Sequence, residues 1–70
     1  MEIITREHYI TKYPSGKIKT GELVLYKDGT LKYQTVVDND PPNIIFNKKY
    51  KNIYYAKKKF KILKDKYFTF

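Results

Sequence analysis

The segment NKKYKNIYYAKKKFKILKDKY, residues 47–67, decides how the rest of the chain is arranged, because its apolar residues follow a helical period. They are spaced three, four, three and four positions apart: Ile53, Ala56, Phe60, Leu63 and Tyr67. At about 100° of rotation per residue, these side chains fall on one narrow stripe of a helix. The spacing therefore predicts an amphipathic helix whose apolar stripe covers another element of the fold.

A strand assignment stays open for parts of residues 50–64. Tyrosine and isoleucine favour strands, so Ile53–Tyr55 and Phe60–Leu63 each have the composition of a short strand. Lysines one turn apart, such as Lys57 and Lys61, also destabilise a helix by roughly 0.2–0.5 kcal/mol. The unbroken period of the stripe favours one helix over two short strands.

The side of this helix opposite the stripe combines lysines with large apolar and aromatic side chains. Its members are Lys51, Tyr54, Tyr55, Lys58, Lys59, Lys61 and Ile62. Two tyrosines and an isoleucine are unusual on a helix surface that contacts only solvent. We interpret the lysines as phosphate contacts and the tyrosines as side chains that stack on a base or pack against a partner. The alternative is that a second element covers the tyrosines, while the lysines only keep the chain soluble.

The positive charge of the protein is concentrated near its C-terminus. Residues 1–46 contain six basic and six acidic residues, whereas residues 47–70 contain nine lysines and one aspartate, which accounts for the whole net charge of +8. This asymmetry indicates a negatively charged partner. Because specific base contacts rely on arginine, and Arg6 is the only arginine, we expect low sequence specificity. The candidate binding residues are Lys48, Lys51, Tyr54, Tyr55, Lys58, Lys59 and Lys61.

The length and composition predict one small cytoplasmic domain. A chain of 70 residues buries only about 60% of its unfolded surface, so its core is small. The absence of cysteine excludes disulfides and thiolate metal sites, and it suits a reducing compartment. No signal peptide is visible, and no apolar run approaches the roughly 20 residues that a membrane span requires.

Residues 1–37 predict a meander of three antiparallel strands. The strands cover residues 2–13, 17–26 and 31–37, with turns at Tyr13–Lys17 and Lys27–Thr30 that contain Pro-Ser-Gly and Asp-Gly. Gly21, in the middle of the second strand, suggests a bulge that changes which side faces the core. A sheet of this size needs a cover on one face. We therefore predict an α+β fold, in which the three-stranded meander packs against one C-terminal helix.

Residues 38–43, with the sequence DNDPPN, form the clearest break in the chain, because proline cannot donate to a sheet ladder. The segment that follows, residues 44–70, is expected to be mainly helical, with Asp40 as the cap of a short helical turn, or Asn43 or Asn47 as the cap of the long helix. Ile44–Phe46 fits either a first helical turn or a short fourth strand. Tyr67–Phe70 is expected to pack back on the sheet, in one version as a short extra strand at the C-terminus.

A short pattern occurs twice, thirteen residues apart. YPSGKIK at residues 13–19 and YKDGTLK at residues 26–32 match at a tyrosine, a glycine, an aliphatic residue and a lysine. The pattern resembles the YxxGxLK hairpin units of MORN-type repeats. The resemblance spans about twenty residues and lacks the longer MORN spacing, and any strand–turn–strand unit needs similar residues. We therefore assign no family from it.

The chain offers few residues for catalysis. Ser15 lies in a predicted turn, His8 lies in a predicted strand and cysteine is absent. The sequence therefore offers no plausible pair of a nucleophile and a general base. Asp38 and Asp40 are better explained as turn formers beside Pro41 than as calcium ligands. No glycine-rich phosphate loop is present. We expect a non-enzymatic protein that uses no metal or cofactor.

The basic segment therefore points to binding. We expect DNA or RNA, bound through its backbone phosphates. The alternative is an acidic surface on a larger host protein, bound by an inhibitor of phage or mobile-element type with tyrosines as anchors. An anionic membrane is disfavoured, because the narrow apolar stripe is needed to cover the sheet. Pairing of two copies across the exposed edge of the sheet is a further expectation.

Overall fold

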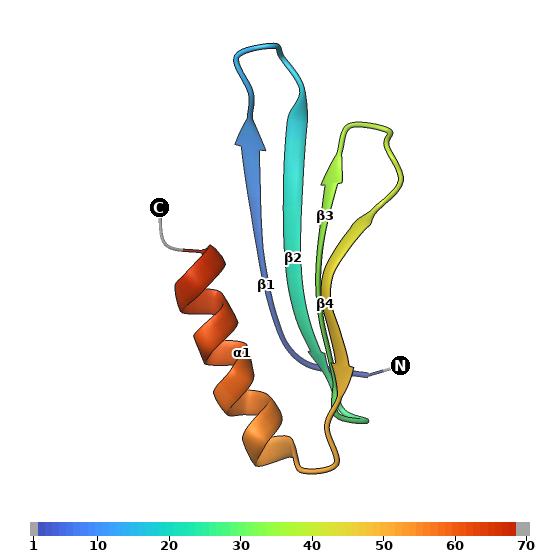
Figure 1. Ribbon diagram of the computed structural model, residues 1–70, viewed down its shortest axis with the longest axis vertical. Helices are drawn as coiled ribbons and strands as arrows, with labels where there is room; N and C mark the ends of the chain where they lie inside the picture. The colour runs from blue at the N-terminus through green and yellow to red at the C-terminus, as the bar shows by residue number, and fades with distance from the viewer. Residues whose placement is uncertain (1, 69–70) are drawn as a thin grey trace.

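The computed structural model describes residues 2–68 as a four-stranded antiparallel sheet with one helix packed across one face (Figure 1). Each strand pairs with the next one along the chain, so the sheet order is β1-β2-β3-β4. The α+β class and the C-terminal helix predicted from the sequence are confirmed. The elements are β1 (Ile3–Lys12), β2 (Ile18–Tyr26), β3 (Thr30–Val37), β4 (Asn43–Lys49) and α1 (Ile53–Tyr67).

The strand count is four rather than three, because Ile44–Phe46 takes the strand alternative. Phe46 pairs with Tyr33 of β3, and Lys48 pairs with Leu31, which adds β4 to the edge of the meander. The helix accordingly begins later than the proposed caps allowed. Asn52 is the N-cap, and its side chain accepts a hydrogen bond of 2.8 Å from the backbone N–H of Tyr54.

The tight turn between β2 and β3 depends on glycine. Gly29 has a φ of 93°, and its N–H donates to the carbonyl of Tyr26 at 3.0 Å. A Cβ at Gly29 would lie 2.1 Å from the carbonyl oxygen of Tyr50, so no larger residue fits without movement of the backbone. The same turn therefore fixes the point where the chain leaves β4 for the helix.

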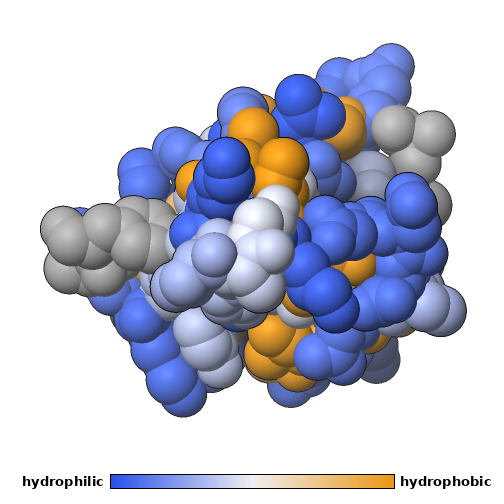
Figure 2. Space-filling view, turned by 90° about the horizontal axis from the view of Figure 1, so that it is seen from above, coloured by the Kyte–Doolittle hydropathy of each residue, from blue (hydrophilic) through white to orange (hydrophobic). Residues whose placement is uncertain are grey.

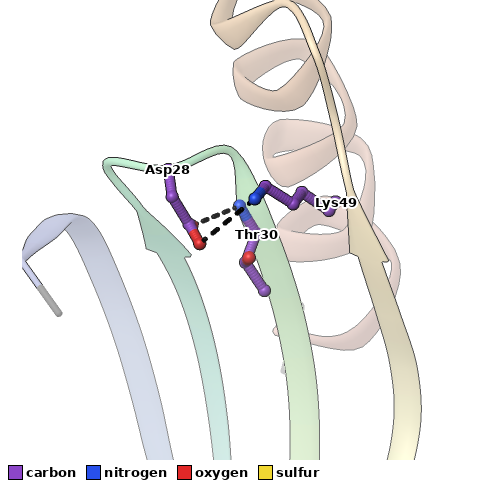
Figure 3. A network of polar contacts seen from close by, with 3 residues as sticks. All are labelled: Asp28, Thr30 and Lys49. Carbon is purple, nitrogen blue, oxygen red and sulfur yellow. Dashed lines mark hydrogen bonds and ion pairs between the residues drawn. The ribbon is translucent and has the colours of Figure 1, made fainter.

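A small polar network supports this turn (Figure 3). The carboxylate of Asp28 accepts a hydrogen bond of 2.9 Å from the backbone N–H of Thr30. The ammonium of Lys49 lies 4.0 Å from the same carboxylate. The Thr30 hydrogen bonds, helped by the charge of Lys49, lower the pKa of Asp28 below its ordinary value. Asp28 thus links the β2–β3 turn to the end of β4.

The core lies between α1 and the central strands β2 and β3. Leu23, Leu25 and Leu31 are fully buried on the sheet side, and Tyr33 is 2% exposed. The helix contributes the predicted stripe: Ala56, Phe60 and Leu63 are buried, and Ile53 and Tyr67 are half-buried. The amphipathic period read from the sequence therefore identifies the side of the helix that faces the sheet.

Gly21 does not form the predicted bulge. The pairing of β2 with β3 is regular, and the register shifts lie between Ile3 and Thr5 and between Tyr33 and Gln34. Gly21 pairs with Tyr9 of β1, and a Cβ at Gly21 would lie 2.1 Å from the Tyr9 ring. The glycine therefore leaves room for an aromatic ring that lies across it.

The C-terminal residues pack on the sheet, but not as a strand within the described part of the chain. The helix continues to Tyr67, whose ring lies 4.7 Å from that of Tyr33. Phe68 is the C-cap, and the centroid of its ring lies 5.0 Å from that of Tyr9, with the two ring planes inclined by 85°. Thr69 and Phe70, on which the predicted extra strand also depended, lie outside the described residues.

The buried hydroxyl of Tyr33 makes folding sensitive to alkaline pH. Burial, together with a hydrogen bond of 2.8 Å between the hydroxyls of Tyr9 and Tyr33, raises the pKa of Tyr33 above its ordinary value of 10. The folded state keeps this proton at a pH where the unfolded state loses it. The stabilisation is complete below about pH 10 and is lost above it, by at most about 1.4 kcal/mol per pH unit.

Tyr33→Phe should therefore lose stability less steeply above pH 10 than the parent protein does. The measurement is the free energy of unfolding from urea titrations between pH 8 and pH 11. Tyr54→Phe is the control, because it removes an exposed tyrosine and keeps Tyr33. Equal slopes for all three proteins would show that Tyr33 does not control the alkaline loss.

Candidate functional site

The packing of α1 turns three large side chains toward solvent. Tyr54 is 62% exposed, Tyr55 is 59% exposed and Ile62 is 56% exposed. They project outward because Ala56, Phe60 and Leu63 hold the opposite side of the helix on the sheet. Within residues 2–68 no second element covers the tyrosines, so the alternative in which they belong to the core is wrong for this chain.

The two tyrosines form a pair at the start of the helix. Their ring centroids are 5.7 Å apart and the ring planes are inclined by 68°, so they meet edge to face and do not stack. The ammonium of Lys58, one turn along the helix, lies 5.4 Å from the centroid of the Tyr54 ring. A cation and two aromatic rings thus occupy one exposed site.

Five of the seven predicted residues gather on this outward side, together with Ile62. Lys51 is exposed in the connection between β4 and the helix, and Lys58 and Lys61 are exposed on the helix. We refer to the set as the lysine–tyrosine surface: Lys51, Tyr54, Tyr55, Lys58, Lys61 and Ile62.

The other two predicted lysines lie beside this surface, along β4. Lys59 is half-buried, and its ammonium lies 5.5 Å from the ring of Phe46. Lys48 pairs with the core residue Leu31, so it lies on the helix side of the sheet, and its ammonium is 5.0 Å from the Tyr50 ring. The structure therefore divides the predicted set between the outer side of the helix and the flank toward β4.

Some charges of the basic segment are neutralised within the chain. Lys64 donates to a carboxylate oxygen of Glu7 in β1 at 3.0 Å, and Lys49 faces Asp28 at 4.0 Å. Both partners come from residues 1–46, whose charges sum to zero. These two lysines thus have carboxylate partners within the chain, which distinguishes them from Lys58, whose ammonium lies over the Tyr54 ring.

The face of the sheet opposite α1, here called the open face, carries exposed isoleucines that the sequence did not single out. Ile10, Ile18 and Ile44 are 69%, 46% and 54% exposed. A shallow hollow of about 330 Å³ on this side is lined by Ile18, Thr20, Val36, Asp38 and Asn39. Viewed from above, apolar side chains also reach the surface between hydrophilic ones (Figure 2). The available signal was Ile10, which shares one face of the first strand with the polar residues Arg6 and His8.

The carboxylate of Asp38 serves the fold at the rim of this hollow. It accepts a hydrogen bond of 3.0 Å from the N–H of Ile18, while the N–H of Asp38 donates to the carbonyl of Ile18 at 2.9 Å. Asp38 has a φ of 48°, which suits aspartate in a turn. This supports the interpretation of Asp38 as a turn former.

Among residues 2–68, no three histidine, aspartate or glutamate side chains come close enough together to form a metal site. No helix in the same part of the chain has the length and apolar character needed to cross a membrane.

Comparison of the chain with models of protein families, with curated proteins and with solved structures found no match in any of the three.

Proposed function

We propose that this protein binds nucleic acid through its lysine–tyrosine surface, without catalysis and with low sequence specificity. The observation that carries the proposal is the exposure of Tyr54 and Tyr55 beside Lys58 on a helix whose apolar stripe is already occupied by the core. Exposed aromatic rings among cations are the usual composition of surfaces that bind single strands.

Each part of the surface has its own role in this proposal. Lys51, Lys58 and Lys61 neutralise backbone phosphates, and Lys48 and Lys59 extend the positive potential along β4. Tyr54 and Tyr55 stack on bases, which adds roughly 1–3 kcal/mol per base. Because a base must be unpaired to stack on a tyrosine, we expect a single strand to bind more tightly than a duplex of the same length.

The direct test is a salt series. A labelled single strand and a duplex are titrated with the protein between 50 and 200 mM salt, and the dissociation constant is read from anisotropy. Because bound lysines release condensed counterions, log affinity should fall linearly with log salt, with a slope of about −0.7 per phosphate contact on the single strand. No binding at 50 mM salt would overturn the proposal, since a protein of charge +8 with these lysines exposed should bind at least weakly.

The second candidate is an acidic surface on a larger protein. Ile62 favours this candidate. It lies seven residues after Tyr55 on the outward side of the helix and is 56% exposed. An exposed isoleucine suits a protein interface, whereas binding to nucleic acid does not require one. A variant with Tyr54→Ala and Tyr55→Ala separates the two candidates. It should abolish a protein complex anchored on these rings, but only weaken binding to a duplex, whose paired bases do not stack on tyrosine and whose affinity comes from contacts between lysines and phosphates.

A further inference from the structure

Strand β1 is an open edge of the sheet. It is the longest strand, with ten residues, and within residues 2–68 no strand lies on its outer side. The other edge, β4, is interrupted by a register shift, carries Lys48 and Lys49, and follows two prolines. Bulges, lysines and prolines are the features by which proteins protect sheet edges. Between Thr5 and Lys12, β1 pairs with β2 without interruption and has neither a bulge nor a proline.

The hydrogen bonds at the β1–β2 turn show which backbone groups of β1 face outward. The N–H of Tyr13 donates to Lys17 at 2.8 Å, so odd-numbered residues of the regular part of β1 bond to β2. Ile18, the partner of Lys12, instead bonds to Asp38 on the far side of β2, which agrees with this alternation. The outward N–H and C=O groups therefore belong to Arg6, His8, Ile10 and Lys12.

The charges in the middle of β1 are balanced within the chain. Arg6 lies 4.0 Å from the carboxylate of Glu22, and Glu7 accepts from Lys64 at 3.0 Å. The strand also belongs to residues 1–46, whose net charge is zero. A second strand beside β1 would thus meet little unbalanced charge, although the protein as a whole carries +8.

We propose that two copies of this chain pair through β1 in an antiparallel, two-fold arrangement centred on His8. A centre at Glu7 places two glutamates opposite each other, and a centre at Tyr9 places Arg6 opposite Lys12 of the second copy. Like charges directly opposite each other destabilise a sheet. With the centre at His8, Arg6 faces Ile10 and Glu7 faces Tyr9, so neither clash arises.

The pairing has a consequence for the outer surface. A two-fold axis perpendicular to the sheet keeps both α1 helices on the same face of one eight-stranded sheet. The two lysine–tyrosine surfaces then lie on the same side of the dimer. One nucleic-acid strand would then make two contacts with the dimer. This statement rests on the proposed function, whereas the pairing itself does not.

The register can be tested with single cysteines, because the chain has none. Opposite residues of a hydrogen-bonded antiparallel pair have Cα atoms about 5.5 Å apart, within the range that a disulfide spans. His8→Cys should therefore give a covalent dimer in high yield under mild oxidation. Ser15→Cys, in the exposed β1–β2 turn, is the control and should stay largely monomeric. Equal yields from the two variants would overturn the proposed register.

The pairing itself is tested by sedimentation of the unmodified protein at high salt, which does not depend on nucleic acid. The mass should rise with concentration from 8.4 kDa toward twice that value. His8→Pro removes an outward N–H, and His8→Lys places two lysines opposite each other. Both should remain monomeric while keeping the circular dichroism spectrum of the fold. A parent protein that stays monomeric at millimolar concentration, or a dimer that both variants leave intact, would overturn the proposal.

Discussion

Replacing Phe60 by alanine should remove a large part of the stability of the protein at 25 °C. Phe60 is 8% exposed and lies in the core cluster formed by α1 and the central strands. Loss of a buried phenylalanine costs about 3–5 kcal/mol. A domain of 70 residues has a total stability of roughly 3.5–10 kcal/mol, so one substitution removes a large part of it. Urea titration followed by circular dichroism measures the change as a fall in the unfolding midpoint.

Ile62→Ala is the matched control on the same helix. Ile62 is two residues away but lies on the outward side and is 56% exposed. Because an exposed substitution usually changes stability by no more than about 0.5 kcal/mol, its midpoint should stay near that of the parent protein. Equal destabilisation by the two substitutions would mean that the helix packs on the sheet through a different side.

The position of the core could be predicted because it depends on two local periods. The helical spacing of Ala56, Phe60 and Leu63 identifies the buried side of α1. The Asp28–Gly29 pair marks the tight turn, and the alternation of Leu31 and Tyr33 after it identifies the buried side of β3. Each of these signals lies within a few residues of the structure that it specifies.

The features that sequence reasoning left open or missed depend on contacts between distant residues. The segment Ile44–Phe46 is too short for its hydrophobic period to distinguish a helix from a strand. It forms a strand because it pairs with β3. The role of Gly21 depends on Tyr9, twelve residues earlier. That contact was accessible, because residues equally far from the centre of the β1–β2 turn at Ser15 lie opposite each other, as Tyr9 and Gly21 do.

The candidate site was predicted as a set of residues but not as a surface. The helical period places Tyr54 and Tyr55 away from the core, yet it cannot tell whether another element covers them. The segment before the helix settles this, because β4 joins the edge of the sheet and leaves the outer side of α1 open. The same arrangement draws Lys59 toward Phe46, away from the other helix lysines.

A charge-reversal pair distinguishes a specific basic surface from a general effect of charge. Lys58→Glu with Lys61→Glu changes the net charge from +8 to +4, since each substitution removes one positive and adds one negative charge. Lys12→Glu with Lys17→Glu makes the same change at exposed positions near the β1–β2 turn. The two double variants therefore differ in where the charge lies and not in how much there is.

We expect the helix variant to bind a single strand at least about 100-fold more weakly at 0.1 M salt, and its log–log salt slope to be shallower by about 1.4, the value for two lost phosphate contacts. The turn variant should lose only the long-range attraction that salt screens, and it should keep the parent slope. Circular dichroism confirms that both variants are folded. If the two variants lose affinity equally and keep the same slope, binding depends on net charge alone and the lysine–tyrosine surface is not where the strand lies.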